Sequence, residues 1–204
     1  MFVDWPMLPA CLSVCRERIG ASLLNRIAQL QVPVENRVEE AGIALDRDRF
    51  TRKMIRELSG TIERVVGVEE ASGYVATVGG LMGNWLNEAY HAELGPDDFD
   101  LDTVARIFVD LKRRIDGGFH VVSIEPDRIV LGNTRCPFSE DVIGRPSLCM
   151  MTSNVFGRIA ADNLGYARVQ LERTIAAGDG RCDVVVHLTP IDMLDSDERE
   201  YYRL

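Results

Sequence analysis

The sequence predicts an α+β fold in which N-terminal helices pack on an antiparallel sheet. Apolar residues recur at helical spacing through the first half of the chain. Gly117 and Gly118 end that pattern. The residues that follow are rich in β-branched side chains and are separated by Gly, Pro and Asp, which is typical of strands joined by turns.

The first half is expected to contain helices at residues 12–30, 43–67, 69–93 and 101–115. Asp46 is a suitable N-cap for the second of these, and Gly67 is a suitable stop. The third contains four interior glycines, each of which costs about 1 kcal/mol relative to alanine. We interpret them as a place where another helix packs closely, and the alternative is the close approach of a ligand. The four are Gly73, Gly79, Gly80 and Gly83.

The second half is expected to form a β-β-α-β-β module with strands at 119–124, 128–131, 166–174 and 182–188 and a helix at 147–163. The chain then divides into a helical extension at 1–44, a ligand-binding domain at 45–190 and an acidic tail at 191–204. Within the domain, helices occupy 45–117 and the cysteine-bearing module occupies 118–190. The extension is a candidate dimer seam. The tail is expected to be a short helix or loosely ordered, and its aromatic end, Tyr201 and Tyr202, is a candidate for docking back onto the domain.

Composition narrows the classes of function. Hydrophobic residues make up 46% and charged residues 27% of the 204 residues, as in globular proteins. A net charge of −9 argues against a nucleic-acid partner. We interpret the basic clusters at 47–53 and 112–114 as solvated helix faces. No apolar run reaches the ~20 residues of a membrane span, and the N-terminus lacks the features of a secretory signal. We therefore expect a cytoplasmic protein whose five cysteines are reduced.

Three cysteines of the module are expected at one edge of the sheet. Cys136 follows the first hairpin, Cys149 lies in the first turn of the helix and Cys182 begins the last strand. Thiolates suit zinc, iron or an iron–sulfur cluster. The spacing matches no zinc motif, so the alternative is that each packs as a small apolar residue. Cys11 and Cys15, four residues apart, are candidates for a fourth ligand, for the core or for a dimer seam.

Cys149 also supports a different hypothesis. A helix N-terminus lowers the pKa of a thiol, which would make this cysteine a nucleophile with His120 or His187 as its base. The sequence contains neither a GxSxG nor an HExxH motif. We favour a role without catalysis.

An apolar ligand site between the glycine-rich helix and the sheet is a third hypothesis. Met82, Trp85, Phe119 and Phe156 would line it. The alternative is that these four side chains belong to the core.

Four motifs carry a resemblance to a known family. They are NTRCPF at 133–138, PSLCMMTSNVFG at 146–157, NLGYA at 163–167 and GDGRC at 178–182. Together they resemble the methanogen output domain 1 family, whose layout is similar to that of 4-vinyl reductase domains and vesicle-tethering (TRAPP) subunits. The likeness extends upstream to Leu45.

The resemblance implies an α+β domain that is dimeric through its helices and has a sensory role, with a small hydrophobic molecule or a metal centre as ligand. It places the cysteines of the family on Cys136, Cys149 and Cys182.

The leading hypothesis is a homodimeric signalling protein. It holds zinc or an iron–sulfur cluster through these three cysteines, responds to a small molecule or gas, and acts through a partner protein. The alternatives are a cysteine-nucleophile hydrolase of a small molecule and a hydrophobic small-molecule binder of the 4-vinyl reductase type.

Overall fold

The computed structural model describes residues 38–190 and 199–203. Of these, residues 38–46 belong to one unit, and residues 47–190 and 199–203 fold together as a second unit, which contains every element discussed below. The helix expected at 12–30 lies outside the described residues, as do Cys11 and Cys15.

Three helices form where the apolar spacing predicts them: α4 (Arg47–Val66), α5 (Val68–Leu94) and α6 (Leu101–Arg113). Gly67, with φ of 89°, separates α4 from α5, and glycine adopts this backbone conformation without strain. The side chain of Asp100 caps α6 by accepting the backbone N–H of Thr103 at 2.8 Å. No helix within the described ranges is both long and apolar enough to cross a bilayer.

The second half forms an antiparallel sheet interrupted by one long helix. Its elements are β1 (Phe119–Glu125), β2 (Arg128–Asn133), α7 (Cys149–Leu164), β3 (Tyr166–Arg173), β4 (Cys182–His187) and β5 (Arg199–Tyr202), and the strand order is β1-β2-β4-β3-β5. This confirms the predicted α+β class and the β-β-α-β-β module.

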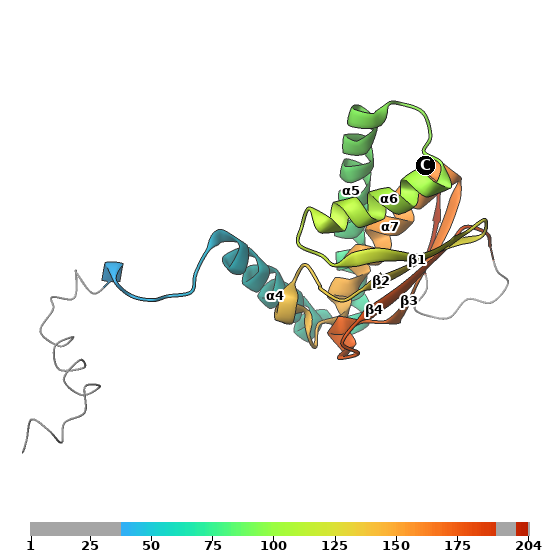
Figure 1. Cartoon of the computed structure of the whole chain (residues 1–204). Helices are drawn as coiled ribbons and strands as arrows, with labels where there is room; N and C mark the ends of the chain where they lie inside the picture. The colour runs from blue at the N-terminus through green and yellow to red at the C-terminus, as the bar shows by residue number, and fades with distance from the viewer. Residues whose placement is uncertain (1–37, 191–198, 204) are drawn as a thin grey trace, which may run out of the picture. The chain divides into compact units, whose positions relative to one another are not determined.

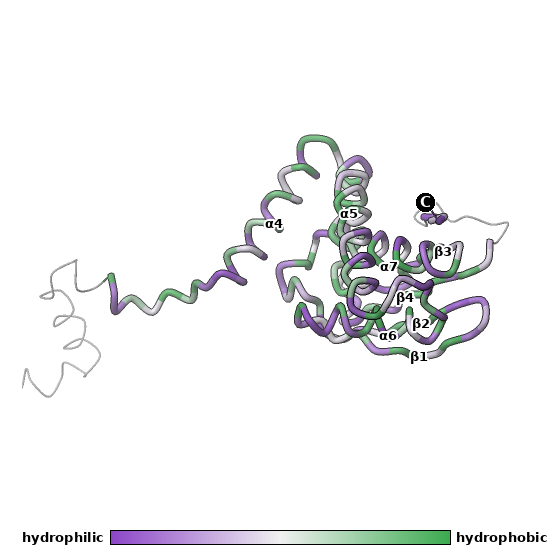
Figure 2. Tube along the Cα trace, turned by 90° about the horizontal axis from the view of Figure 1, so that it is seen from above, coloured by the Kyte–Doolittle hydropathy of each residue, from purple (hydrophilic) through white to green (hydrophobic). Residues whose placement is uncertain are grey.

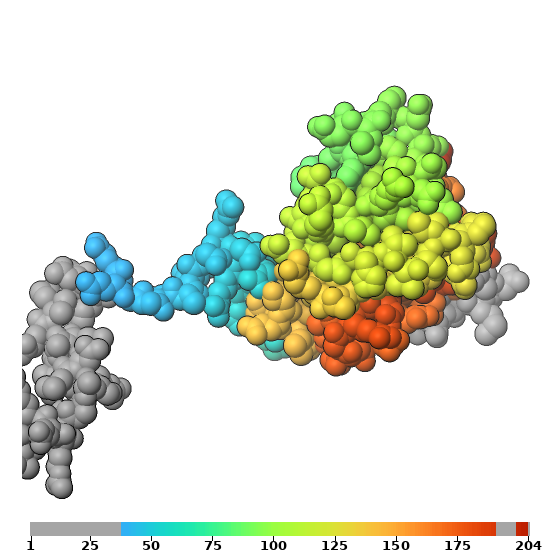
Figure 3. All heavy atoms as spheres, viewed as in Figure 1, coloured from blue at the N-terminus to red at the C-terminus, as the bar shows by residue number. Residues whose placement is uncertain are grey.

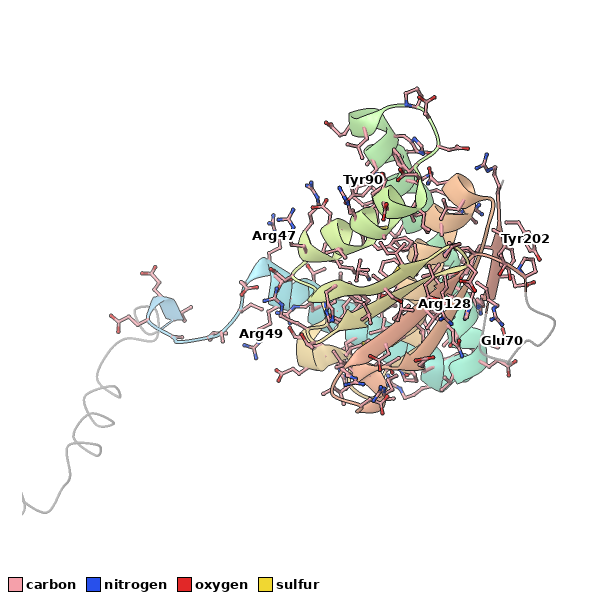
Figure 4. All side chains as sticks on the ribbon, turned by 45° about the vertical axis from the view of Figure 1, so that its right-hand side comes forward. Arg47, Arg49, Glu70, Tyr90, Arg128 and Tyr202 are labelled. Carbon is pink, nitrogen blue, oxygen red and sulfur yellow. The ribbon has the colours of Figure 1, made fainter. Side chains whose placement is uncertain are left out.

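The fifth strand is a correction to the expected tail. Residues 199–202 are neither helical nor loosely ordered, because they pair with β3 as an edge strand, with Tyr202 opposite Tyr166. Tyr202 is labelled in Figure 4. The expectation that the aromatic end docks onto the domain is confirmed.

α7 packs against β3 and also against α5, so it lies between the sheet and the long helix (Figures 1 and 2). A Cβ added to Gly79 or Gly83 would lie 2.7 Å from the Cβ of Asn154 or Arg158 on α7. The prediction that glycines allow close helix packing is therefore right for these two. Gly73 and Gly80 have open space on their side of α5.

The main core lies between the sheet and the helices. Phe108 of α6 stacks on Phe156 of α7 with ring centroids 4.3 Å apart, and Phe119 of β1 meets Phe156 edge-on at 5.5 Å. A smaller buried cluster of Val142, Leu148 and Ala176 contacts Cys136 and Cys149. The space between these two clusters is where the candidate site lies.

Candidate functional site: a three-cysteine cavity

Three elements bring the cysteines to one end of the sheet. Cys182 begins β4 opposite Asn133, the last residue of β2. Cys136 lies three residues beyond the end of β2, and Cys149 is the first residue of α7. All three line a single cavity of about 30 Å³. The structure thus brings together the three cysteines that the sequence singles out.

Two hydrogen-bond donors point at the sulfur of Cys182. The backbone N–H of Ile175 donates to Sγ at 3.4 Å, and Nδ2 of the buried Asn133 donates to it at 3.7 Å. The orientation of Asn133 is fixed because its Oδ1 accepts the backbone N–H groups of Gly118 and Arg135. Both contacts hold the sulfur of Cys182 at this end of the sheet.

Cys149 is a different thiol from the one the sequence predicts. Burial raises its pKa to about 12, and burial also raises the pKa of Cys136. The expectation of a lowered pKa at a helix N-terminus is wrong. A 3₁₀ turn, η2 (Pro146–Leu148), runs directly into α7, and the N–H of Cys149 already donates to the carbonyl of Pro146. The protonated thiol is a poor nucleophile near pH 7.

Neither candidate base lies in the cavity wall. His120 is exposed, and it follows Phe119, so its side chain leaves the opposite face of β1. His187 is at the far end of β4 from Cys182, and its Nε2 lies 3.1 Å from Oε1 of Gln170. The structure does not assemble the cysteine–histidine pair of the hydrolase hypothesis.

Lys112 is the residue beside the cavity that the sequence did not reveal. Its side chain is buried, with 4% exposure, which contradicts the solvated face expected for residues 112–114. Nζ donates to Oγ1 of Thr152 at 2.7 Å and lies within 5.3 Å of the ring centroids of Phe119 and Phe156. Burial lowers the pKa of Lys112 to about 8, and negative charge on the three cysteines raises it.

A helical count along α6 could have found Lys112. It follows Phe108 by four residues and therefore lies on the same buried face. Arg113 and Arg114, its neighbours in the basic cluster, instead pair with Asp110 at the surface. The cluster therefore contains one buried and two exposed cations.

The four residues proposed to line an apolar ligand site do not surround one cavity. Trp85 is 58% exposed, Met82 packs partly on the core and Phe156 is fully buried within it. Phe119 reaches the three-cysteine cavity. The volume of that cavity is far smaller than the roughly 300 Å³ of the smallest pockets that typically hold organic ligands.

The chemistry of the donor set suits a metal, but its geometry is not that of a finished metal site. Over residues 38–190 and 199–203, no three His, Cys, Asp or Glu side chains are grouped closely enough to hold an ion. The three sulfurs border one cavity without forming a ready coordination set. A bound ion would have to draw them inward.

The segment that leads into Cys149 makes polar contacts with α4. Ser147, two residues before Cys149, donates from Oγ to Glu63 at 2.6 Å and lies 2.8 Å from Oγ of Ser59. Arg145 forms an ion pair with Glu63 at 3.4 Å. The segment before α7 therefore lies beside α4 (Figure 3), and its polar contacts connect that helix to the start of α7.

Comparison with known proteins gives a structural neighbour and a family. The neighbour is a trafficking protein particle complex subunit 3 from Naegleria fowleri covalently bound to palmitic acid; it is 13% identical over 76% of this chain and 99% of that one, with a TM-score of 0.48. No curated protein matches the chain in sequence. The family model for methanogen output domain 1 matches residues 54–187, well over half of the chain. The chain therefore belongs to the methanogen output domain 1 family.

Proposed function

We propose that the protein is a sensory or output domain that reads its signal at the three-cysteine cavity. The occupant in this proposal is a divalent metal ion held by Cys136, Cys149 and Cys182. The observation that carries the proposal is that three cysteines from separate elements line one small cavity. Cysteine thiolates are soft ligands that suit zinc and iron.

The size of the cavity favours a single ion. A volume of about 30 Å³ corresponds to one or two water molecules. An iron–sulfur cluster needs a larger space, so we treat it as the alternative occupant. Three cysteines leave a fourth position for a small ligand or for a further cysteine, as in zinc sites that retain an open position.

The contacts of Ser147 supply a route from the cavity to the rest of the domain. Closing the three sulfurs on an ion would move Cys149 and, with it, the turn that holds Ser147. Ser147 contacts Ser59 and Glu63 of α4. We therefore propose that occupancy is reported as a change in the position or stability of α4, which a partner protein would recognise.

We also propose a homodimer formed through the outer face of α5. Tyr74, Val78, Leu81 and Trp85 follow one another at helical spacing, and each is roughly half or more exposed. Gly73 and Gly80 lie beside them with open space in front. Within residues 38–190 and 199–203, no other segment fills the space in front of these glycines, so a second α5 is the occupant that we propose.

Metal analysis of the protein purified without oxygen tests the cavity proposal. We expect about one equivalent of zinc or iron and no sulfide in the wild type. In Cys149→Ser we expect the metal content to fall to near zero with the far-ultraviolet circular dichroism spectrum unchanged. Cys11→Ser and Cys15→Ser serve as matched variants, and a partial loss in one of them would identify the fourth ligand.

Two results would contradict the proposal. A wild-type protein that contains no metal, and takes up neither Zn²⁺ nor Co²⁺ under reducing conditions, would exclude a metal-binding cavity. Full metal occupancy in Cys149→Ser would show that any metal is bound elsewhere. Iron together with sulfide would replace the single ion by a cluster.

A further inference from the structure

Lys112 places a positive charge next to the cavity without an acidic partner. Within the described residues, the ammonium group of Lys112 hydrogen-bonds only to Thr152, and no carboxylate pairs with it. The remaining surroundings of the ammonium group include the rings of Phe119 and Phe156. Burying an ammonium group that has no anionic partner destabilises the folded state. An anionic group beside Lys112 would offset that destabilisation.

We infer that Lys112 and Thr152 form the charge-balancing partner of the metal centre in the three-cysteine cavity. The inference rests on the proposed function and assigns a role to two residues that are not ligands. Three thiolates around a divalent ion carry one net negative charge, and the ammonium group of Lys112 cancels it. Three neutral thiols would leave that ammonium group uncompensated.

Thr152 connects the charge to the cavity. Its hydroxyl oxygen accepts a hydrogen bond from Lys112, so its own proton remains available for a second hydrogen bond. Thr152 lines the cavity, and it lies three residues after Cys149 on α7, on the same side of the helix. The hydroxyl is therefore placed to donate either to a bound thiolate or to a ligand at the open position of the metal.

This arrangement distinguishes the site from three cysteines that merely pack together. If the three cysteines were only core residues, a methionine or leucine at position 112 would pack beside them equally well. A cation at position 112 gains more from negative charge in the cavity than from the rings of Phe119 and Phe156 alone. Outer-shell residues of this kind tune metal affinity without touching the metal.

Titration with Co²⁺ at pH 7 tests the inference, because thiolate-bound Co²⁺ has a charge-transfer absorption that reports the ligands directly. We expect Lys112→Met to weaken Co²⁺ binding by about 10- to 100-fold with the same absorption bands, the range typical of outer-shell variants. Thr152→Val should weaken binding in the same direction by a smaller factor. Lys53→Met is the matched control, since Lys53 is exposed and pairs with Glu57, and its affinity should equal that of the wild type.

Each outcome decides a different question. Wild-type affinity in Lys112→Met overturns the charge-balancing role and leaves the metal site in place. Absence of the thiolate bands in the wild type overturns the proposed function itself. Thermal unfolding without metal shows whether each variant is folded; if Lys112→Met is not, unchanged affinity in Thr152→Val overturns the inference.

Discussion

At the scale of the single residue, the burial of Lys112 gives the metal-free protein a defined dependence of stability on pH. Its pKa falls from 10.5 to about 8 on folding because burial disfavours the charged form. Below pH 8 both the folded and the unfolded states are protonated, so the full cost of the buried charge is present. Between pH 8 and 10.5 the folded state releases the proton while the unfolded state keeps it, and stability rises with pH.

Lys112→Met should abolish this rise. In the presence of a chelator, we expect the variant to gain relative stability near pH 7 and to lose that advantage by pH 10, a relative change of about 3 kcal/mol at most. The raised pKa values of Cys136 and Cys149 reduce stability above pH 9 in both proteins and largely cancel in the difference. Urea unfolding at pH 7 and pH 10 measures the effect, and identical slopes with pH in both proteins would refute it.

At the scale of the element, α5 has one face that packs on α7 and one face that is exposed. Gly79 and Gly83 bring it close to α7, and a methyl group on either would collide with that helix. The opposite face exposes Tyr74, Leu81 and Trp85. An apolar stripe of this length is typical of a surface that contacts another molecule.

Variants of that exposed face test the proposed dimer. Leu81→Glu should convert the dimer to a monomer, because a charge would be buried in the seam. Gly80→Ala is the sharper change: it should stabilise an isolated helix by about 1 kcal/mol and yet weaken the dimer, since the added methyl group separates the two helices. Sedimentation velocity over a range of concentrations reads both effects, and a wild type that is monomeric throughout would rule out this seam.

At the scale of the whole molecule, β5 closes the fold over α7. The ring of Tyr201 lies so close to Gly157 that an added Cβ would come within 2.2 Å of it. The hydroxyl of Tyr201 lies 3.3 Å from the hydroxyl of Ser153. Burial raises the pKa of Tyr201 to about 12. The edge strand is thus fixed to the helix as well as to β3.

Gly157→Ala should destabilise the protein by about 1–3 kcal/mol through this collision. In a Tyr201→Ala background the same substitution should cost little, because the obstructing ring is gone. Chemical unfolding of the two single variants and the double variant gives the coupling energy. Additive effects would show that β5 does not rest on Gly157.

The sequence predicted this fold where the pattern is local and failed where distant contacts decide. Apolar periodicity located α4 to α7 and β1 to β4 to within a few residues, and the ends of the hairpin and the helix brought the three cysteines together. β5 was missed because an acidic tail has no strand pattern of its own and forms only by pairing with β3. The burial of Lys112 and the raised pKa of Cys149 depend on packing from other elements, which composition and spacing do not report.

The bulge in β1 has a consequence for how copies of the molecule meet. β1 is an edge strand, and its pairing with β2 slips between Val121 and Ser123, leaving Val122 outside the register and 61% exposed. An irregular edge is a poor template for a further strand, so sheets of neighbouring molecules do not readily join along β1. Open-ended strand addition is therefore disfavoured at this edge of the sheet.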